Sequence, residues 1–398
     1  MKQEKGFSLI ELLVAITILL VVTAVATNMI LQAQHVSEAI GLQGNMVQDL
    51  RAGMHFIVRD LTQAGEGIPQ GGISVPNTAA GVSAIARPGT PAASIFRSQD
   101  PVPVTYAKLP PVVPGFRLGS VVTTQNPSTK AILTGGFNTD IITVLYKDNT
   151  LVSSVGGAAA PALDAYSVTQ PAPAVPACAG VITATGSSVT LDPACFTMPG
   201  GPTPLAVGNL IMFHNINGTA LEYITSINGA TINFAAGDPA GLNQTGLPNG
   251  TVSNLAVGAT PTSIARVWMV TYYLDTATIP ARPQLIRQVN YPNFPAANPA
   301  NPPQPVGEVI ENLSFSYDII SSADPAGTYA NGPGNAPTSI APDTPFSFRA
   351  VNVYLGGRSE YPWTGTNPPQ FLRSSLNTQV SVRSLSFGLL FPTPGILP

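Results

Sequence analysis

An acidic side chain interrupts the apolar segment at the start of the chain. Glu11 lies within GFSLIELLVAITILL, and the 20 residues from Leu12 to Leu31 carry no charge. An ionisable residue inside a membrane segment is costly, and by default it is functional and has a partner. Glu11 could therefore form an ion pair with a cation that also lies in apolar surroundings, where opposite charges attract strongly if their geometry is good.

The two cysteines of the chain offer a second kind of chemistry. Cys178 and Cys195 flank CAGVITATGSSVTLDPAC, which has the pattern of a β-hairpin. A disulfide is favoured if the chain leaves the cytoplasm, and two buried free thiols are the alternative. A metal site is not indicated, because the spacing is not CxxC and no histidine lies between the two cysteines.

The other polar residues show no pattern typical of an active site. His35 and His55 fall on a predicted helix, and His214 falls in a predicted strand without an acidic or cysteine neighbour. The chain has no GxSxG, HExxH, P-loop or dinucleotide-binding pattern. We therefore predict no enzymatic activity, no cofactor and no metal site, although Asp238 and Asp324 are loop acids of the kind that binds calcium.

The charge balance argues against nucleic acid as a partner. The formal net charge is −3, and the 17 Lys and Arg residues form no run, whereas a nucleic-acid footprint needs a basic patch. Only 9% of the residues are charged, 40 are proline and 44% are hydrophobic. This composition is typical of a β-rich protein with long, proline-stiffened loops and a sizeable core, and not of a disordered chain.

The apolar segment is long enough to span a membrane. Twenty helical residues at about 1.5 Å each reach about 30 Å, the thickness of the hydrocarbon core. Lys2 and Lys5 precede the segment, which favours a cytoplasmic N-terminus and an external body. Three interpretations compete: a secretory signal cut near Ala24-Val25-Ala26, a plain signal anchor, and a segment in which Glu11 has its own role.

The third interpretation leads to a family. The stretch KGFSLIELLVAITILL resembles the N-terminus of type IV prepilins and type II secretion pseudopilins. The resemblance implies that a prepilin peptidase removes residues 1–6 by cutting after Gly6 and then N-methylates Phe7. It also implies that Glu11 pairs with the N-terminal amine of a neighbouring subunit. The cut would create that amine, which gives the acid its partner and sets the axial register between helices.

The helix is predicted to continue beyond the membrane. No proline precedes Pro69, and apolar residues recur every three or four positions, which is the spacing of one helix face. These residues are Met46, Leu50, Met54, Ile57, Leu61 and Ala64. We expect one helix over residues 8–64, about 85 Å long. Its part at 7–31 would form the membrane and filament-core segment, and its part at 32–65 would dock on a globular head.

The rest of the chain is predicted to form that head, giving an α+β fold with a long N-terminal helix on a mainly antiparallel sheet. We expect an irregular segment with the first head strands at 66–149, an inserted β-hairpin module at 150–260 and a C-terminal sheet region at 261–398. The clearest strand patterns lie at 139–148, 265–275, 284–289, 309–320, 348–357 and 378–387. In 309–320, alternation predicts that Leu313, Phe315, Tyr317 and Ile319 face the core.

The head also carries a weaker resemblance. The stretch VRDLTQAG at 58–65 and the strand layout resemble PilW-type minor pilins, with J-type pseudopilins next. The residues that match are Glu311, Leu313, Tyr317, Arg358, Ser359 and Arg383.

The function implied is a structural minor pilin that helps initiate or assemble a type IV pilus near its tip. The alternatives are a J-like pseudopilin of type II secretion and a pilus-borne adhesin whose binding module is 150–260. An envelope hydrolase is the fourth function considered. The partners of the minor pilin would be other pilin subunits through the helix, the prepilin peptidase, the inner membrane before assembly and an unspecified surface ligand. The protein would be single-pass in the inner membrane and then part of an external pilus.

Overall fold

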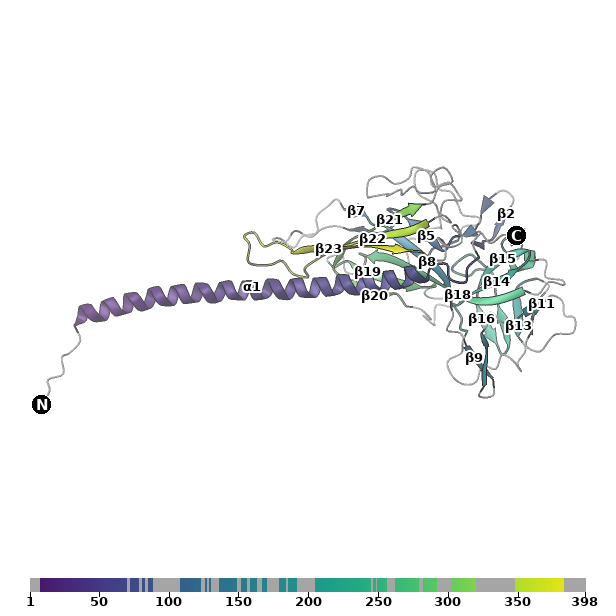
Figure 1. Ribbon diagram of the computed structural model, residues 1–398, viewed down its shortest axis with the longest axis horizontal. Coiled ribbons are helices and arrows are strands. Elements are labelled where there is room, and N and C mark those ends of the chain that lie inside the picture. The colour runs from purple at the N-terminus through teal and green to yellow at the C-terminus, as the bar shows by residue number, and fades with distance from the viewer. Residues whose placement is uncertain are drawn as a thin grey trace.

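One long helix leads into a β-rich head in the computed structural model (Figure 1). The structure describes residues 8–69, 72–78, 81–82, 85–88, 108–122, 126, 129, 136–148, 152–155, 158–162, 167–169, 179–183, 185–191, 205–244, 246–247, 249–255, 262–278, 282–291, 302–319 and 348–382. The α+β layout predicted from the sequence is confirmed.

Helix α1 runs without a break over Leu9–Gln63, which confirms the helix predicted over 8–64. The predicted stripe faces the head, since Leu50, Ile57 and Leu61 are fully buried. The helix ends at Gln63 with Ala64 as its C-cap, and the chain then turns through Gly65 and Gly67, whose φ angles are +78° and +67°. Glycine suits these positions because it adopts left-handed conformations without a steric penalty.

The strand β18, Thr262–Asp275, joins the two ends of the head. Its first residues pair with β14 and β11, and its last residues pair with β8 and β19. Val267 lies where these regions meet, because it pairs with Leu210 of β14 and with Lys147 of β8. One continuous strand therefore connects the hairpins within 150–260 to the sheet that carries the helix.

The large sheet is almost entirely antiparallel, with one parallel pair, β11 and β12. Its main path is β15 (Gly218–Tyr223), β14 (Leu210–Asn215), β18, β11 (Ser167–Thr169), β12 (Ala179–Ile182), β13 (Ser188–Leu191), β17 (Thr231–Asn233) and β16 (Ser226–Asn228). Beside β18 lie β8 (Ile141–Lys147) with its partner β5 (Val112–Gly115), and β19 (Gln284–Val289) with its partner β20 (Gln304–Glu308).

A second sheet of three antiparallel strands consists of β21 (Ile310–Ile319), β22 (Phe348–Arg358) and β23 (Arg373–Ser381). Four short pairs complete the described strands: β1 (Ile73–Ser74) with β4 (Lys108–Leu109), β2 (Asn77–Thr78) with β3 (Gly81–Val82), β6 (Val121–Val122) with β7 (Phe137–Asn138), and β9 (Val152–Val155) with β10 (Ala158–Ala162). A 3₁₀ helix covers Val252–Leu255.

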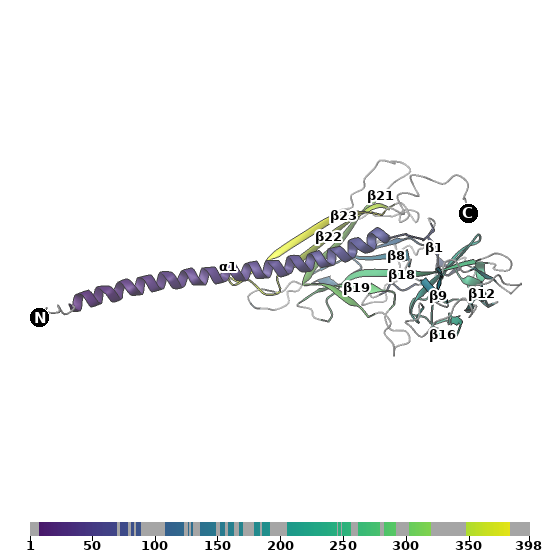
Figure 2. The same cartoon turned by 60° about the horizontal axis from the view of Figure 1, so that its bottom comes forward.

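The second half of α1 packs one face against both sheets. Figure 2 shows β21, β22 and β23 on one side of the helix and β8, β18 and β19 on the other. The buried face of α1 shares one hydrophobic core with residues of these strands, including Tyr272, Leu285 and Leu355. Burial of this apolar surface is the main force that holds the helix on the head.

The hairpin predicted between Cys178 and Cys195 is confirmed, and it is one of three in the 150–260 region. The three hairpins are β12–β13, β14–β15 and β16–β17. The strand predicted over 139–148 is β8, whose residues from Ile141 to Tyr146 are buried. The β12–β13, β14–β15 and β16–β17 hairpins enclose a core of their own, which includes Phe213 and Phe234 in an edge-on ring contact with centroids 5.7 Å apart.

Two strand predictions need comment. The last strand, predicted over 378–387, begins instead at Arg373, because Ser374 and Ser375 continue the pairing with β22. Its end at Ser381 precedes Arg383, which lies outside the described residues. In β21 the predicted alternation holds from Leu313 to Tyr317, while the side chain of Ile319 is outside the described part.

Candidate functional site: the helix terminus and its junction with the head

The first turn of α1 holds the acid that the sequence singles out. The Ser8 backbone N–H donates a hydrogen bond of 3.0 Å to Glu11 Oε2, and the Glu11 side chain is exposed. An acid in the first turn caps free backbone donors and is favoured by the helix dipole. The Ser8 amide directly follows Phe7 in the chain, so Glu11 lies close to where a cut after Gly6 would create an amine. Gly6 and Phe7 themselves are outside the described residues.

The apolar first half of α1 has no cover from the head. Its large side chains are exposed, from 81% at Leu9 to 47% at Leu31. This helix is the one described segment that is long and apolar enough to cross a membrane, and none of its most apolar window is buried. An exposed apolar surface this long needs lipid or other helices as its environment.

The threonines within this segment satisfy their own hydroxyl groups. Thr17, Thr23 and Thr27 donate hydrogen bonds of 2.7–2.8 Å to carbonyl oxygens three or four residues earlier. A hydroxyl bonded in this way does not require water. The segment therefore presents an apolar surface despite these threonines. A hydropathy value alone does not reveal this, because it does not show which hydroxyl groups are already hydrogen-bonded.

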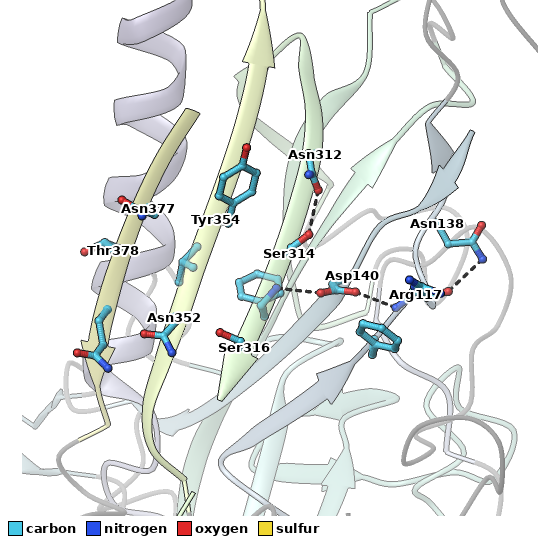
Figure 3. A pocket seen from close by; sticks show the side chains of 14 residues that line it. Arg117, Asn138, Asp140, Asn312, Ser314, Ser316, Asn352, Tyr354, Asn377 and Thr378 are labelled. Carbon is cyan, nitrogen blue, oxygen red and sulfur yellow. Dashed lines mark hydrogen bonds between the residues drawn. The ribbon is translucent and has the colours of Figure 1, made fainter. Parts of the chain in front are cut away.

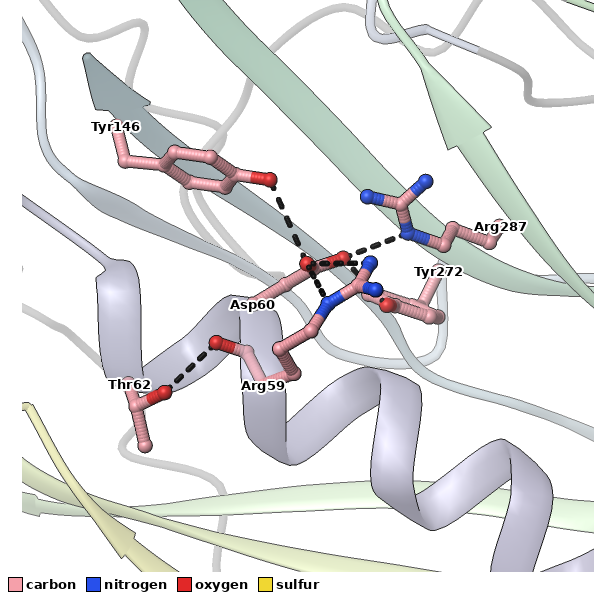
Figure 4. Close-up of polar contacts among 6 residues, drawn as sticks. All are labelled: Arg59, Asp60, Thr62, Tyr146, Tyr272 and Arg287. Atoms are coloured by element: carbon pink, nitrogen blue, oxygen red, sulfur yellow. Dashed lines mark hydrogen bonds and ion pairs between the residues drawn. The ribbon is translucent and has the colours of Figure 1, made fainter. Parts of the chain in front are cut away.

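At the other end of α1, a buried carboxylate ties the helix to the head. Asp60 is fully buried, and its Oδ2 accepts hydrogen bonds from Tyr272 Oη at 2.6 Å and Arg287 Nε at 2.7 Å. Its Oδ1 accepts from Arg59 at 3.2 Å and from Tyr146 Oη at 3.4 Å (Figure 4). These partners come from α1, β8, β18 and β19, so one carboxylate joins four elements.

The electrostatics of this cluster favour the ion pair. Burial and the neighbouring Asp60 raise the pKa of Tyr146 to about 12, and the same two causes raise the pKa of Tyr272 further. Burial opposes the charge of Arg287, but the hydrogen bond and attraction to Asp60 raise its pKa above its ordinary value. The tyrosines therefore remain neutral donors and the arginine remains charged at neutral pH.

A second contact lies far along the helix. In the loop between β22 and β23, Trp363 Nε1 donates a hydrogen bond of 3.0 Å to the carbonyl oxygen of His35. The hydroxyl of Thr364 donates to Glu38 at 2.9 Å and lies 3.2 Å from the ring of His35. Asp60 and this loop thus hold α1 at two widely separated points, which fixes its direction relative to the head.

Three of the six residues that carried the resemblance in the head, Glu311, Arg358 and Ser359, lie at one junction. Glu311 forms ion pairs with Arg358 at 2.9 Å and Arg373 at 3.0 Å, which join the three strands of the second sheet. The Ser359 hydroxyl accepts from the Leu372 N–H at 3.1 Å and donates to the carbonyl of Tyr361, which closes the base of the loop. Leu313 and Tyr317 belong instead to the core around α1.

The other residues considered from the sequence do not form a site together. Cys178, Cys195 and Asp324 lie outside the described residues, so the disulfide stays a prediction. Asp238 accepts hydrogen bonds from the backbone N–H groups of Ala240, Leu242 and Asn243, which is a loop-stabilising arrangement. No group of three or more His, Cys, Asp or Glu side chains among the described residues could hold a metal ion.

Comparison with known families identifies the N-terminal segment. Residues 1–27 match the prokaryotic N-terminal methylation motif, the signal of type IV pilin-like prepilins. The chain therefore carries a prepilin-type N-terminus, which implies processing by a prepilin peptidase and assembly with pilin-like subunits in general. The apolar helix behind it is consistent with anchoring in the inner membrane. No curated protein and no solved structure matches the chain.

Proposed function

We propose that this protein is a PilW-like minor pilin of a type IV pilus, which takes part in filament initiation or assembly near the tip. The observation that carries the proposal is the combination found in α1. A prepilin-type signal extends into a helix whose first half is exposed and apolar, and whose second half buries one face against the head. One helix is thus built to pack on other helices while it carries a head.

The surface of the first half suits two successive environments. Before assembly it would lie in the inner membrane, where lipid covers the side chains between Leu9 and Leu31. In the filament, the helices of other subunits would replace the lipid, because both surroundings are apolar and the threonine hydroxyls are already bonded. The transfer from membrane to filament then needs no change in the helix.

Glu11 would direct this packing. Removal of residues 1–6 creates a cationic amine on Phe7, which an apolar environment destabilises unless it is paired. The exposed carboxylate of Glu11 can pair with such an amine of a neighbouring subunit at only one axial offset between the two helices. The pairing therefore selects one register among the many that an apolar surface alone would allow.

The head supports a place near the tip. It contains all the described strands, and the hairpins beyond β18 extend it away from the helix (Figure 1). Subunits inside a filament shaft must fit their heads at the close spacing of their helices, whereas a subunit at the tip has neighbours on one side only. A large head with an additional hairpin region fits the tip more easily.

Deleting the gene in its native host tests this function. We expect fewer surface pili, as counted by electron microscopy, and restoration by the wild-type gene. Normal pilus numbers together with loss of protein secretion would replace the proposal with the pseudopilin alternative. Normal pili, normal secretion and loss of surface attachment would favour the adhesin alternative.

A further inference from the structure

A polar pocket lies on the outer face of the second sheet, away from α1. It has a volume of about 920 Å³ and is bounded by β21, β22 and β23 on one side and by Phe116, Arg117, Asn138 and Asp140 on the other (Figure 3). None of the residues described so far as positioning the helix lines it. The pocket is large enough for a small-molecule ligand, since such sites are typically about 300–1,000 Å³.

Strand register arranges the floor of the pocket in two rows. Ser314, Tyr354 and Asn377 are paired across the three strands, and Ser316, Asn352 and Gln379 form the next row. Adjacent strands are about 4.8 Å apart, so each row extends over about 10 Å. The alternate residues of the same strands, such as Val353 and Phe315, are buried against the core.

Five carboxamide side chains line this pocket. They are Asn138, Asn312, Asn352, Asn377 and Gln379. A carboxamide carries a donor and an acceptor on the same carbon atom, the arrangement that can bind neighbouring hydroxyl groups of a sugar ring. A surface exposed only to solvent does not require five carboxamide side chains around a single pocket.

Much of this hydrogen-bonding capacity is unused. Among the described residues, the side chains of Ser316, Tyr354 and Asn377 have no hydrogen-bond partner. Asn352 uses its Nδ2 to bind Asp318 at 3.2 Å, which leaves its carbonyl oxygen available, and Gln379 binds the same carboxylate through Nε2 at 2.6 Å. Asp318 thereby fixes two carboxamides while their acceptor oxygens stay open.

Aromatic rings and a rigid wall complete the pocket. Tyr354 is 39% exposed, and Phe116 also lines the pocket, with the Arg117 guanidinium 4.9 Å from its ring centre. The wall is held in place because Asp140 accepts backbone hydrogen bonds of 2.8 Å from Arg117 and from Phe315 of β21. Exposed ring faces suit the apolar C–H face of a sugar, and the fixed wall limits the ordering cost of binding.

From these contacts we propose that the pocket between the second sheet and the wall of Phe116, Arg117, Asn138 and Asp140 binds a neutral oligosaccharide. The carboxamides and serines bind its hydroxyl groups, and Tyr354 and Phe116 pack on its rings. A neutral ligand fits because, among the described residues, the lining holds one cation, Arg117, and one acid, Asp140, and is otherwise uncharged. This site does not depend on the role proposed for α1.

A glycan array tests the proposal with the full-length protein. The chain is purified in an amphipathic polymer, since many mild detergents carry sugar headgroups that would compete. The labelled protein is applied to neutral di- to tetrasaccharides of glucose, galactose, mannose and N-acetylglucosamine, beside sialylated and sulfated glycans. We expect binding to at least one neutral oligosaccharide and competition by the same free sugar.

Variants locate the binding. Tyr354→Ala and Asn377→Ala each remove an exposed side chain and should lower the affinity about tenfold. Tyr361→Ala is the matched control, because Tyr361 is 58% exposed and does not line the pocket. Equal melting temperatures establish that the variants are folded. The proposal is overturned by no binding to neutral sugars, by binding to acidic glycans only, or by binding that both pocket variants retain.

Discussion

Asp60 of the helix and Arg287 of β19 form a buried ion pair with a distance of 2.7 Å, 227 residues apart in the chain. Their contact is the polar centre of an otherwise apolar junction. Because Tyr272 and Tyr146 also donate to Asp60, the carboxylate is well solvated by the protein. The helix can satisfy this acid in one position on the head only, so the pair determines how the stem is aligned.

Replacing Asp60 should therefore destabilise the protein strongly. Asp60→Ala leaves Arg287 charged and buried without its partner, and such a loss costs about 3–5 kcal/mol. The free energy of unfolding, from urea denaturation followed by tryptophan fluorescence, measures the effect. Arg282→Ala is the control, because its ion pairs with Glu308 and Glu360 are partly exposed and are worth about 1 kcal/mol or less. Equal losses in the two variants would be inconsistent with this role.

The loop contact on the helix should be local in its effect. Trp363→Phe keeps an aromatic ring but removes the hydrogen bond to His35, a loss of about 0.5–1.5 kcal/mol. We expect faster hydrogen–deuterium exchange in residues 359–372 with little change in melting temperature. Tyr361→Phe serves as the control, since Tyr361 is exposed. Unchanged exchange in the Trp363 variant would show that the loop is held by other contacts.

Burial of Glu222 predicts a pH dependence of stability. Burial raises the pKa of this carboxyl well above 4.5, and the hydrogen bond from the Val252 N–H at 3.3 Å opposes the shift only in part. Above pH 4.5 the unfolded chain loses this proton while the folded chain keeps it. The contribution of Glu222 to stability is thus full below pH 4.5 and declines as pH rises toward the folded-state pKa.

Glu222→Gln should reduce this decline, because the amide is neutral at every pH and still accepts a hydrogen bond. Melting temperatures from pH 4 to pH 8 measure the difference between the variant and the wild type. The control is Glu308→Gln, whose side chain is 51% exposed. A wild-type profile identical to that of Glu222→Gln would mean that Glu222 does not titrate as described.

The predicted disulfide between Cys178 and Cys195 can be measured directly. The two cysteines flank the confirmed β12–β13 hairpin in the sequence. Alkylation without reductant should leave both unmodified in the mass spectrum of protein exported from the cell. Closing a loop of this length stabilises by about 3 kcal/mol, so reduction should lower the melting temperature. Two alkylated thiols before reduction would establish the free-thiol alternative.

Glu11 should matter for assembly and not for folding. Its side chain is exposed and its hydrogen-bond partner is the backbone of Ser8. Glu11→Gln removes the charge that would pair with a neighbouring amine, so we expect the chain to remain in the membrane fraction and to be depleted from sheared filaments. Glu11→Asp keeps the charge and should retain part of the assembly. Equal incorporation of Glu11→Gln and the wild type would remove the ion pair from the account.

Periodicity predicted the helix and the longer strands, because each of these patterns depends on neighbouring residues. The stripe from Met46 to Ala64 and the alternation in β21 are local patterns that burial then confirmed. Asp60 shows the limit of this reasoning. It lies between Ile57 and Leu61 on the buried side of α1. A single acidic residue in an apolar helix stripe is nevertheless predicted to be exposed, because a partner that is distant in the chain cannot be recognised from local sequence.

The polar pocket could not be predicted from the sequence for a related reason. Alternating Asn, Ser and Tyr residues indicate only that one face of each strand is outside the core. The grouping of Asn352, Asn377 and Ser316 follows from the register among β21, β22 and β23. That register connects segments separated by long loops, and the wall held by Asp140 comes from a still earlier part of the chain.

The central claim is that the chain is a prepilin whose processed helix enters a filament, and the N-terminus of the cellular protein tests it most directly. Mass spectrometry of the N-terminal peptide is compared between cells that contain the prepilin peptidase and cells that lack it. We predict that the peptide begins at N-methylated Phe7 when the peptidase is present and retains residues 1–6 when it is absent. A chain that keeps Gly6 in both strains, or one that begins after Ala26, would contradict the account.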